Sequence, residues 1–258
     1  MDQILPAWRK GLQMKNPLKR WDVFITLVCF LLVIPAERYE VFSLLEDQTI
    51  AYRHLFRQVY GDPAMMQLSD EIVLVSLDGD LYQEYDSYPF RRTDLGKIAS
   101  TLSDMGASVV VLDFLMDYKS SYDEDEPTAE YFQAAGNVLL VSYAHFDGDE
   151  FLKLTYPTEV LAEHTRSGYS NLAPTSAIID NLARLRVHKQ IANNKDGWPL
   201  AVQALALHWK VEPSLEGDTL KFGDRLSVPL DHRSDIYIDF PALPPGTRYL
   251  AESGFSAL

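Results

Sequence analysis

The sequence predicts an α/β protein: a three-layer sandwich with a mainly parallel central sheet, a more irregular α+β second half, and one transmembrane helix before them. Three observations predict this class. Apolar, strand-like runs alternate with helical segments between residues 71 and 144, the pattern of crossovers between parallel strands. One uncharged apolar run occupies residues 23–36. The chain has 258 residues, 47% of them hydrophobic, which suffices for one sizeable core.

The transmembrane anchor is predicted over residues 23–36, VFITLVCFLLVIPA. This run is short for a hydrocarbon core of ~30 Å, but Lys19, Arg20 and Trp21 can extend it into the headgroup region. Residues 1–22 hold five bases and two acids and form a basic leader. The positive-inside rule therefore predicts a cytoplasmic leader and an external body. A cleaved signal peptide and a buried soluble helix are the alternatives.

The rest of the chain is strongly acidic. The whole chain carries a net charge of −14 and the leader carries +3, so the remainder carries −17. Such a body repels a phosphate backbone, and no nucleic-acid partner is expected. The single cysteine, Cys29, cannot form an intrachain disulfide or a cysteine-rich zinc site.

The first half of the body alternates between helices and strands. Residues 47–61 carry apolar side chains at roughly helical spacing, which predicts an amphipathic helix. Thr93 or Asp94 is the predicted cap of a second helix, which Gly106 closes, and a third helix ends at Gly136. The third helix is predicted over residues 126–135, and buried strands are predicted over residues 71–78, 107–114 and 137–144.

The second half is less regular. Residues 198–209 predict a buried helix with Pro199 in its first turn. Residues 219–230 predict a hairpin that turns at Gly223 and Asp224. Short strands are predicted over residues 185–190 and 235–240.

Acidic residues follow two of the predicted strands. Asp78 and Asp113 end the first and second strands, and the carboxyl edge of an open parallel sheet is where ligands bind. Asp80, Asp117 and Asp123 are near them in sequence, and Arg91 and Arg92 lie on the intervening loop. These seven residues are the ligand-binding candidates, as a site for a metal or a polar ligand. The alternative is an arginine–carboxylate network that caps strand and helix ends.

The string LDGDL at residues 77–81 offers an enzymatic alternative. An Asp-x-Asp after an apolar strand resembles, locally, the motif of haloacid-dehalogenase-type phosphatases. A divalent-metal phosphohydrolase would then use Asp78 and Asp80. The Asp-Gly-Thr continuation is absent, and the chain has no G-x-S-x-G, G-x-G-x-x-G or His-x-x-x-His pattern. No catalytic residue and no cofactor are therefore predicted.

The order of several segments resembles the second type of CHASE domain, an extracellular sensory module found with bacterial cyclases and kinases. The matching segments are IVLVSLD (72–78), YPFRR (88–92), the helix and strand at 92–114, SYDEDE (121–126), GYSNL (168–172), IDNLARLRV (179–187), WPLAVQALAL (198–207) and DIYIDF (235–240). One departure is that Asp180, Asn181, Arg184 and Arg186 stand where the family often has Asp-x-Asp-Gly-x-x-Arg.

The resemblance implies an extracytoplasmic sensory domain over residues 42–258 of a bacterial signal-transduction protein. Such a protein sits in the inner membrane with its sensor in the periplasm or outside the cell. The domain would bind a signal that the sequence does not identify, and would act on a cytoplasmic effector, a cyclase or kinase, that these residues do not include. A homodimer is compatible with this arrangement.

Overall fold

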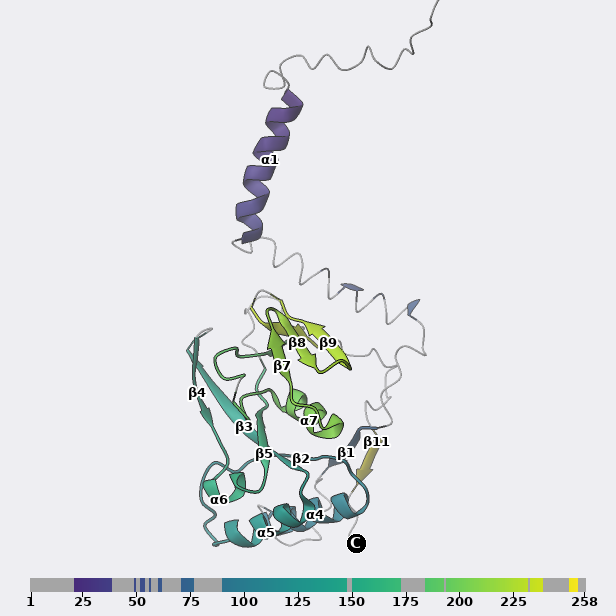
Figure 1. Ribbon diagram of the computed structural model, residues 1–258, viewed down its shortest axis with the longest axis vertical. Coiled ribbons are helices and arrows are strands. Elements are labelled where there is room, and N and C mark those ends of the chain that lie inside the picture. Colours follow the sequence, from purple (N-terminus) through teal and green to yellow (C-terminus); the bar gives the residue numbers. More distant parts are fainter. Residues whose placement is uncertain are drawn as a thin grey trace, which may run out of the picture. The chain divides into compact units, whose positions relative to one another are not determined.

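The computed structural model (Figure 1) describes residues 21–38, 49, 52–53, 56, 60–61, 71–76, 90–147, 150–172, 184–192, 194–231, 233–238 and 251–254. The chain divides into two compact units, residues 1–53 and residues 54–258.

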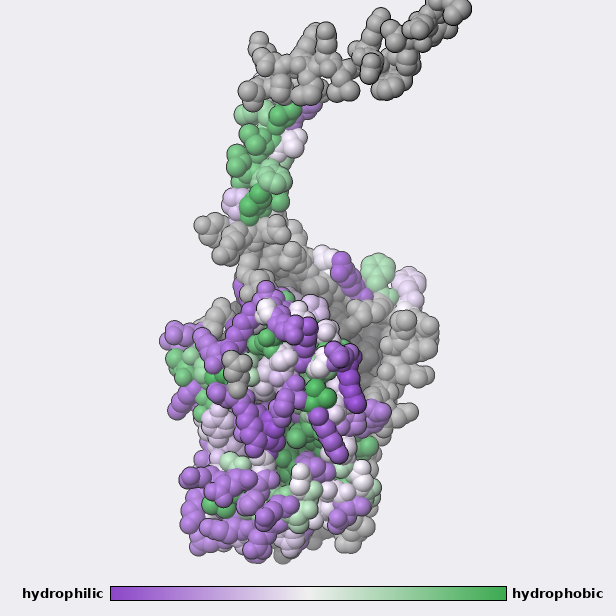
Figure 2. Space-filling view, viewed as in Figure 1, coloured by the Kyte–Doolittle hydropathy of each residue, from purple (hydrophilic) through white to green (hydrophobic). Residues whose placement is uncertain are grey.

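The first unit contains helix α1, Trp21–Arg38, which includes the predicted anchor run. Its large apolar side chains are exposed around the whole helix, from Trp21 at 76% to Val28 at 37%. Figure 2 shows this helix as an almost continuous hydrophobic surface. Among the described helices, none combines the length and the apolar character needed to span a membrane.

The predicted amphipathic helix over residues 47–61 lies mostly outside the described residues. Those described before Gly61, namely Thr49, Tyr52, Arg53, Phe56 and Tyr60, are helical. The rings of Phe56 and Tyr60 stack at 5.9 Å, one helical turn apart. The boundary between the two units falls within this segment, after Arg53.

The central sheet of the second unit has four strands, three of them parallel. Strand β3 pairs in parallel with β2 and β5, and its second half forms an antiparallel hairpin with β4. The hairpin with β4 was not predicted from the sequence. The strands are β2 Val110–Leu115, β3 Val138–Asp147, β4 Glu150–Thr155 and β5 Arg166–Tyr169.

Helices cover both faces of this sheet. Val138 and Leu140 of β3 share a core with buried residues of α4, α5 and α6. A Cβ on Gly168 of β5, which pairs with Val141, would meet the backbone of Leu200 in α7. Because neighbouring residues of a strand face opposite ways, α7 covers the other face, and the predicted three layers are present. The helices are α4 Arg92–Asp104, α5 Asp125–Ala135, α6 Glu159–Ala162 and α7 Leu200–Trp209.

Local sequence signals explain where α4 and α5 end. Gly106 follows α4 with φ +102°, and Gly136 caps α5 with φ +69°, a region that glycine enters without a Cβ clash. The N-cap of α4 is Arg91, whose side chain makes no capping hydrogen bond. The predicted caps, Thr93 and Asp94, therefore lie inside the helix.

Burial of the strands differs from the prediction for two of the three apolar runs. Strand β3 is buried over its first five residues, as predicted, whereas β2 buries only alternate residues, Val110 and Leu112. Strand β1, Val73–Ser76, pairs in parallel with β11, Ala251–Gly254. Val73 and Leu74 are 57% and 49% exposed, so β1 is not buried on both faces, since β11 is its one described strand neighbour.

The second half contains two small antiparallel sheets beside α7. The predicted hairpin is present as β8 and β9, and β7 adds a third strand to it. Strands β6 and β10, near the two predicted short strands, pair with each other. A second hydrophobic core joins this region to α7 through Trp198, Val202 and Phe222. The strands are β6 Arg184–Arg186, β7 Ser214–Glu216, β8 Thr219–Phe222, β9 Leu226–Pro229 and β10 Asp235–Tyr237.

Candidate functional site

Five of the seven candidates predicted from the sequence lie among the described residues. Asp78 and Asp80 lie outside those residues, so their proximity to the others stays a prediction. Asp113 lies where the register of β2 against β3 shifts, between Leu112 and Leu115, and it is exposed. In the described ranges, no group of three His, Cys, Asp or Glu side chains could hold a metal ion.

The loop between β2 and α5 carries two more of these candidates. Asp117 and Asp123 are both exposed. Asp123 has a positive φ of 53° and pairs with Lys119 at 3.2 Å, with both side chains largely in solvent. An exposed pair of this kind contributes little to stability.

Arg92 joins the start of α4 to the start of α5. Its guanidinium donates to Asp125 Oδ1 at 2.5 Å and to the backbone oxygen of Tyr118 at 2.6 Å, and the Arg92 and Asp125 side chains are both largely buried. The backbone N–H of Arg92 donates to Glu124 Oε2 at 3.1 Å. These contacts satisfy buried charges and fix the two helices together. Arg91, the adjacent candidate, is exposed at the N-cap.

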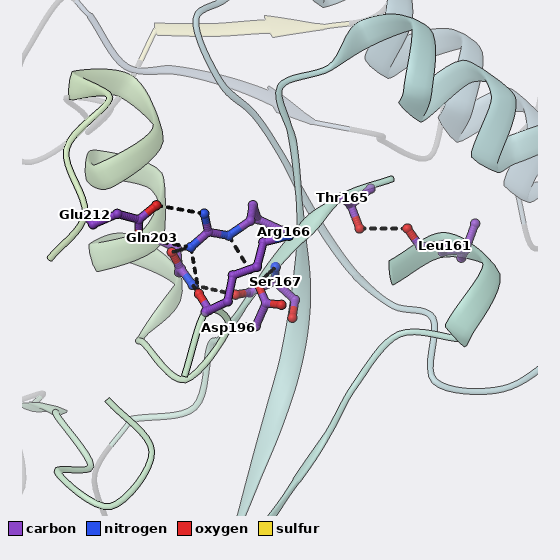
Figure 3. Close-up of polar contacts among 8 residues, drawn as sticks. Leu161, Thr165, Arg166, Ser167, Asp196, Gln203 and Glu212 are labelled. Atoms are coloured by element: carbon purple, nitrogen blue, oxygen red, sulfur yellow. Dashed lines mark hydrogen bonds and ion pairs between the residues drawn. The ribbon is translucent and has the colours of Figure 1, made fainter. Parts of the chain in front are cut away.

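A second polar cluster fixes α7 against β5 (Figure 3). Figure 3 shows the Arg166 guanidinium among Asp196, Gln203 and Glu212. Its nitrogens lie 3.4 Å from Asp196 and 3.1 Å from Glu212. Gln203 is fully buried, and its amide donates to the backbone oxygens of Ser167 and Lys195. Most polar groups at this junction are therefore paired, whereas Arg166 Nε, 3.4 Å from Asp196, makes no hydrogen bond among the described residues.

A third polar cluster lies where β6 and β10 pair. Arg186 and Asp235 are partners in the strand register. The arginine Nε and one terminal nitrogen donate to the two carboxylate oxygens at 2.6 and 3.0 Å. The Tyr169 hydroxyl donates to the backbone oxygen of Arg186 at 2.7 Å and accepts from the backbone N–H of His188 at 3.2 Å. Tyr169 thus connects the central sheet to the β6 strand.

The His188 ring is enclosed by aromatic side chains. Its centroid lies 4.8 Å from that of Phe146, 5.3 Å from Phe151 and 5.5 Å from Tyr169. His188 Nε2 is buried with no hydrogen-bond partner among the described residues. Burial lowers the pKa of His188 to about 4, and the charge of Arg186 acts in the same direction. The imidazole is therefore neutral at pH 7. Burial also raises the pKa of Tyr169.

A surface hollow of about 290 Å³ opens beside this third cluster. Its wall combines basic, polar and apolar side chains from β4, from β6 with the turn that follows it, and from the turn before β10. The lining residues include Arg186, Lys189, Arg233, His188, Glu150 and Phe151. This arrangement is suited to holding a small polar molecule, because a few charged groups stand beside an apolar wall.

A protein-family model, described as the CHASE2 domain, matches residues 24–253. The chain belongs to the CHASE2 family. The resemblance seen in the sequence is thereby confirmed, and it extends from α1 through both halves of the body. No curated protein and no solved structure matches the chain. CHASE2 domains are extracellular sensory domains, so this chain is a sensory domain.

Sequence reasoning missed the polar residues at the centre of this CHASE2 domain. Arg186 and Asp235 stand in short segments that were used for strand prediction, and neither was a site candidate. The available signal was a charged residue in each of two short predicted strands, Arg186 in LRVHKQ and Asp235 in DIYIDF, which are 49 residues apart. Pairing cannot be deduced from either segment alone, because it depends on the register of β6 against β10.

Proposed function

We propose that this CHASE2 domain is the extracytoplasmic sensor of a membrane-bound bacterial signal-transduction protein. It binds a signal outside the cytoplasm and transmits it to a cytoplasmic effector, a cyclase or a kinase. The single observation that carries this proposal is the family match over residues 24–253, because the family consists of extracellular sensory domains.

The attachment to the inner membrane is proposed through α1. Its apolar side chains are exposed on every side, a distribution that is costly in water and favourable in lipid. A helix of 18 residues is about 27 Å long at ~1.5 Å per residue, close to the ~30 Å hydrocarbon core. The basic leader before it and the acidic body after it favour a cytoplasmic N-terminus.

Transmission needs a signal with different affinities for two states of the domain. The segment over residues 47–61 follows α1, and the boundary between the two units falls within it. It is therefore the element through which we propose that a change in the domain reaches the membrane. Position alone is not coupling, and inserting one or two residues beside Glu46 tests whether this segment carries the change.

Reporter fusions test the proposed topology. Alkaline phosphatase, which is active only in the periplasm, should be active when fused after residue 258, and green fluorescent protein at the same position should be dark. A matched variant replaces the five bases of residues 1–22 by glutamine and should lower the phosphatase signal, because it removes the charge asymmetry. A bright fluorescent fusion on the unaltered chain would contradict the proposal.

A further inference from the structure

We propose that the hollow between β4, the turn after β6 and the turn before β10 is a binding site for a small organic carboxylate. The inference rests on the proposed sensory function, because the ligand would be the signal or part of it. The hollow holds about 290 Å³, at the small end of the ~300–1,000 Å³ of ligand pockets, so the ligand is a small molecule.

The charges of the residues that line the hollow favour an anionic ligand. Three cations and one carboxylate, Glu150, line the hollow, although the body as a whole is strongly acidic. Asp235 and Asp218, the acids that pair with Arg186 and Lys189, do not line the hollow, and screening limits the reach of more distant acids to about 8 Å at physiological salt. A ligand in the hollow therefore faces mainly cationic groups. One carboxylate is too few for a divalent cation, which takes several oxygen ligands.

The three cations differ in how firmly their present contacts hold them. Arg186 is paired with the buried carboxylate of Asp235, which balances its charge and fixes the position of its guanidinium. Lys189 pairs with Asp218 at 2.6 Å, but the two side chains are 47% and 69% exposed. Exposed pairs are weak, so Lys189 can leave Asp218 and pair with the carboxylate of a ligand. Arg233 lies in the turn of residues 231–234, which backbone and side-chain bonds to Asp231 hold in place.

The remaining wall favours an organic anion over an inorganic one. Phe151 and Val187 present apolar groups, and the neutral His188 ring lies next to Phe151. Such surfaces stabilise an apolar or aromatic body through burial and stacking. Gln190 and Ser234 also line the hollow and can orient a carboxylate by hydrogen bonds.

The test uses the full chain in detergent with benzoate as the probe, followed by calorimetry and by the NMR signal of the His188 ring. Benzoate should bind saturably and shift that signal. Benzamide, of similar shape and without charge, and inorganic phosphate, without an apolar part, should each bind at least tenfold more weakly. Lys189→Gln and Arg233→Gln should each weaken benzoate about tenfold, the usual effect of losing a charged hydrogen bond.

Lys153→Gln is the matched control, since Lys153 is an exposed lysine of β4 that does not line the hollow. It should leave the affinity unchanged. The proposal is overturned if benzoate gives no saturable response at 10 mM, about the weakest affinity such a site would show. It is equally overturned if benzamide or phosphate binds as well as benzoate, or if the three variants behave alike. None of these results bears on the reporter fusions, so failure of the site and failure of the proposed function remain distinguishable.

Discussion

The buried pair of Arg186 and Asp235 should be a large single contributor to the stability of the second half. Its side chains are 7% and 0% exposed, and two charged hydrogen bonds of 2.6 and 3.0 Å join them. Charged hydrogen bonds contribute about 1.5–3 kcal/mol each, and removing one partner of a buried pair costs about 3–5 kcal/mol. Asp235→Ala should therefore lower the free energy of unfolding by about 3–5 kcal/mol.

The exposed pair of Lys189 and Asp218 provides the control. Its nitrogen–oxygen distance is also 2.6 Å, but both side chains are largely in solvent. Asp218→Ala should cost about 0–1 kcal/mol. Charge and shortest distance are matched, so the comparison tests burial together with the second hydrogen bond of the buried pair.

Urea unfolding of the full chain, followed by near-UV circular dichroism, measures both free energies. The double variant Arg186→Met with Asp235→Leu should recover much of the loss, because apolar groups of similar volume replace a buried pair at little cost. Equal effects of Asp235→Ala and Asp218→Ala would refute the argument from burial. A double variant as unstable as Asp235→Ala would also refute it.

Three further predictions concern His188, Gly168 and the segment after α1. Since burial lowers the pKa of His188 from 6.5 to about 4, the unfolded chain binds its proton more tightly. The neutral His188 should therefore contribute about 3 kcal/mol to the free energy of unfolding above pH 6.5, and this contribution should be lost as the pH falls to about 4. The variant His188→Gln should remove this pH dependence from the urea midpoints. Gly168→Ala should cost about 1–3 kcal/mol, measured in the same way, because its Cβ would lie 2.7 Å from Leu200 Cα. Inserting one or two residues beside Glu46 in the complete protein should alter effector output at unchanged ligand affinity. Unaltered output would place transmission in another element.

Local signals in the sequence were sufficient for α4, α5 and β3. The apolar face of α4, with Gly106 after it, and the run that ends α5 at Gly136 placed both helices to within three residues. Strand β3 reads as a continuous apolar run and is buried on both faces. The predicted hairpin at Gly223 was also correct, since the turn residues and the flanking strands are adjacent in sequence.

Non-local pairing could not be predicted in the same way. Apolar runs of similar composition gave a β3 that is buried over its first five residues, a β2 that is buried only at Val110 and Leu112, and a largely exposed β1, because burial depends on which strands and helices become neighbours. The same limit applies to the candidate site. Arg92 was a site candidate, but its partners Glu124 and Asp125 were not, and the Arg186–Asp235 pair links segments that are 49 residues apart.

The parallel pairing of β1 with β11 determines how these two strands respond to a pulling force. The two strands run in parallel in a register from Val73 opposite Ala251 to Ser76 opposite Gly254. A pull on the chain before β1 and an opposite pull on the chain after β11 would load the hydrogen bonds between them in shear, all at once, because parallel bonds are evenly spaced along the strands. Two strands loaded in this direction separate only when their hydrogen bonds break together, rather than one bond at a time. The chain before β1 and the chain after β11 are thus joined by a connection that resists shear.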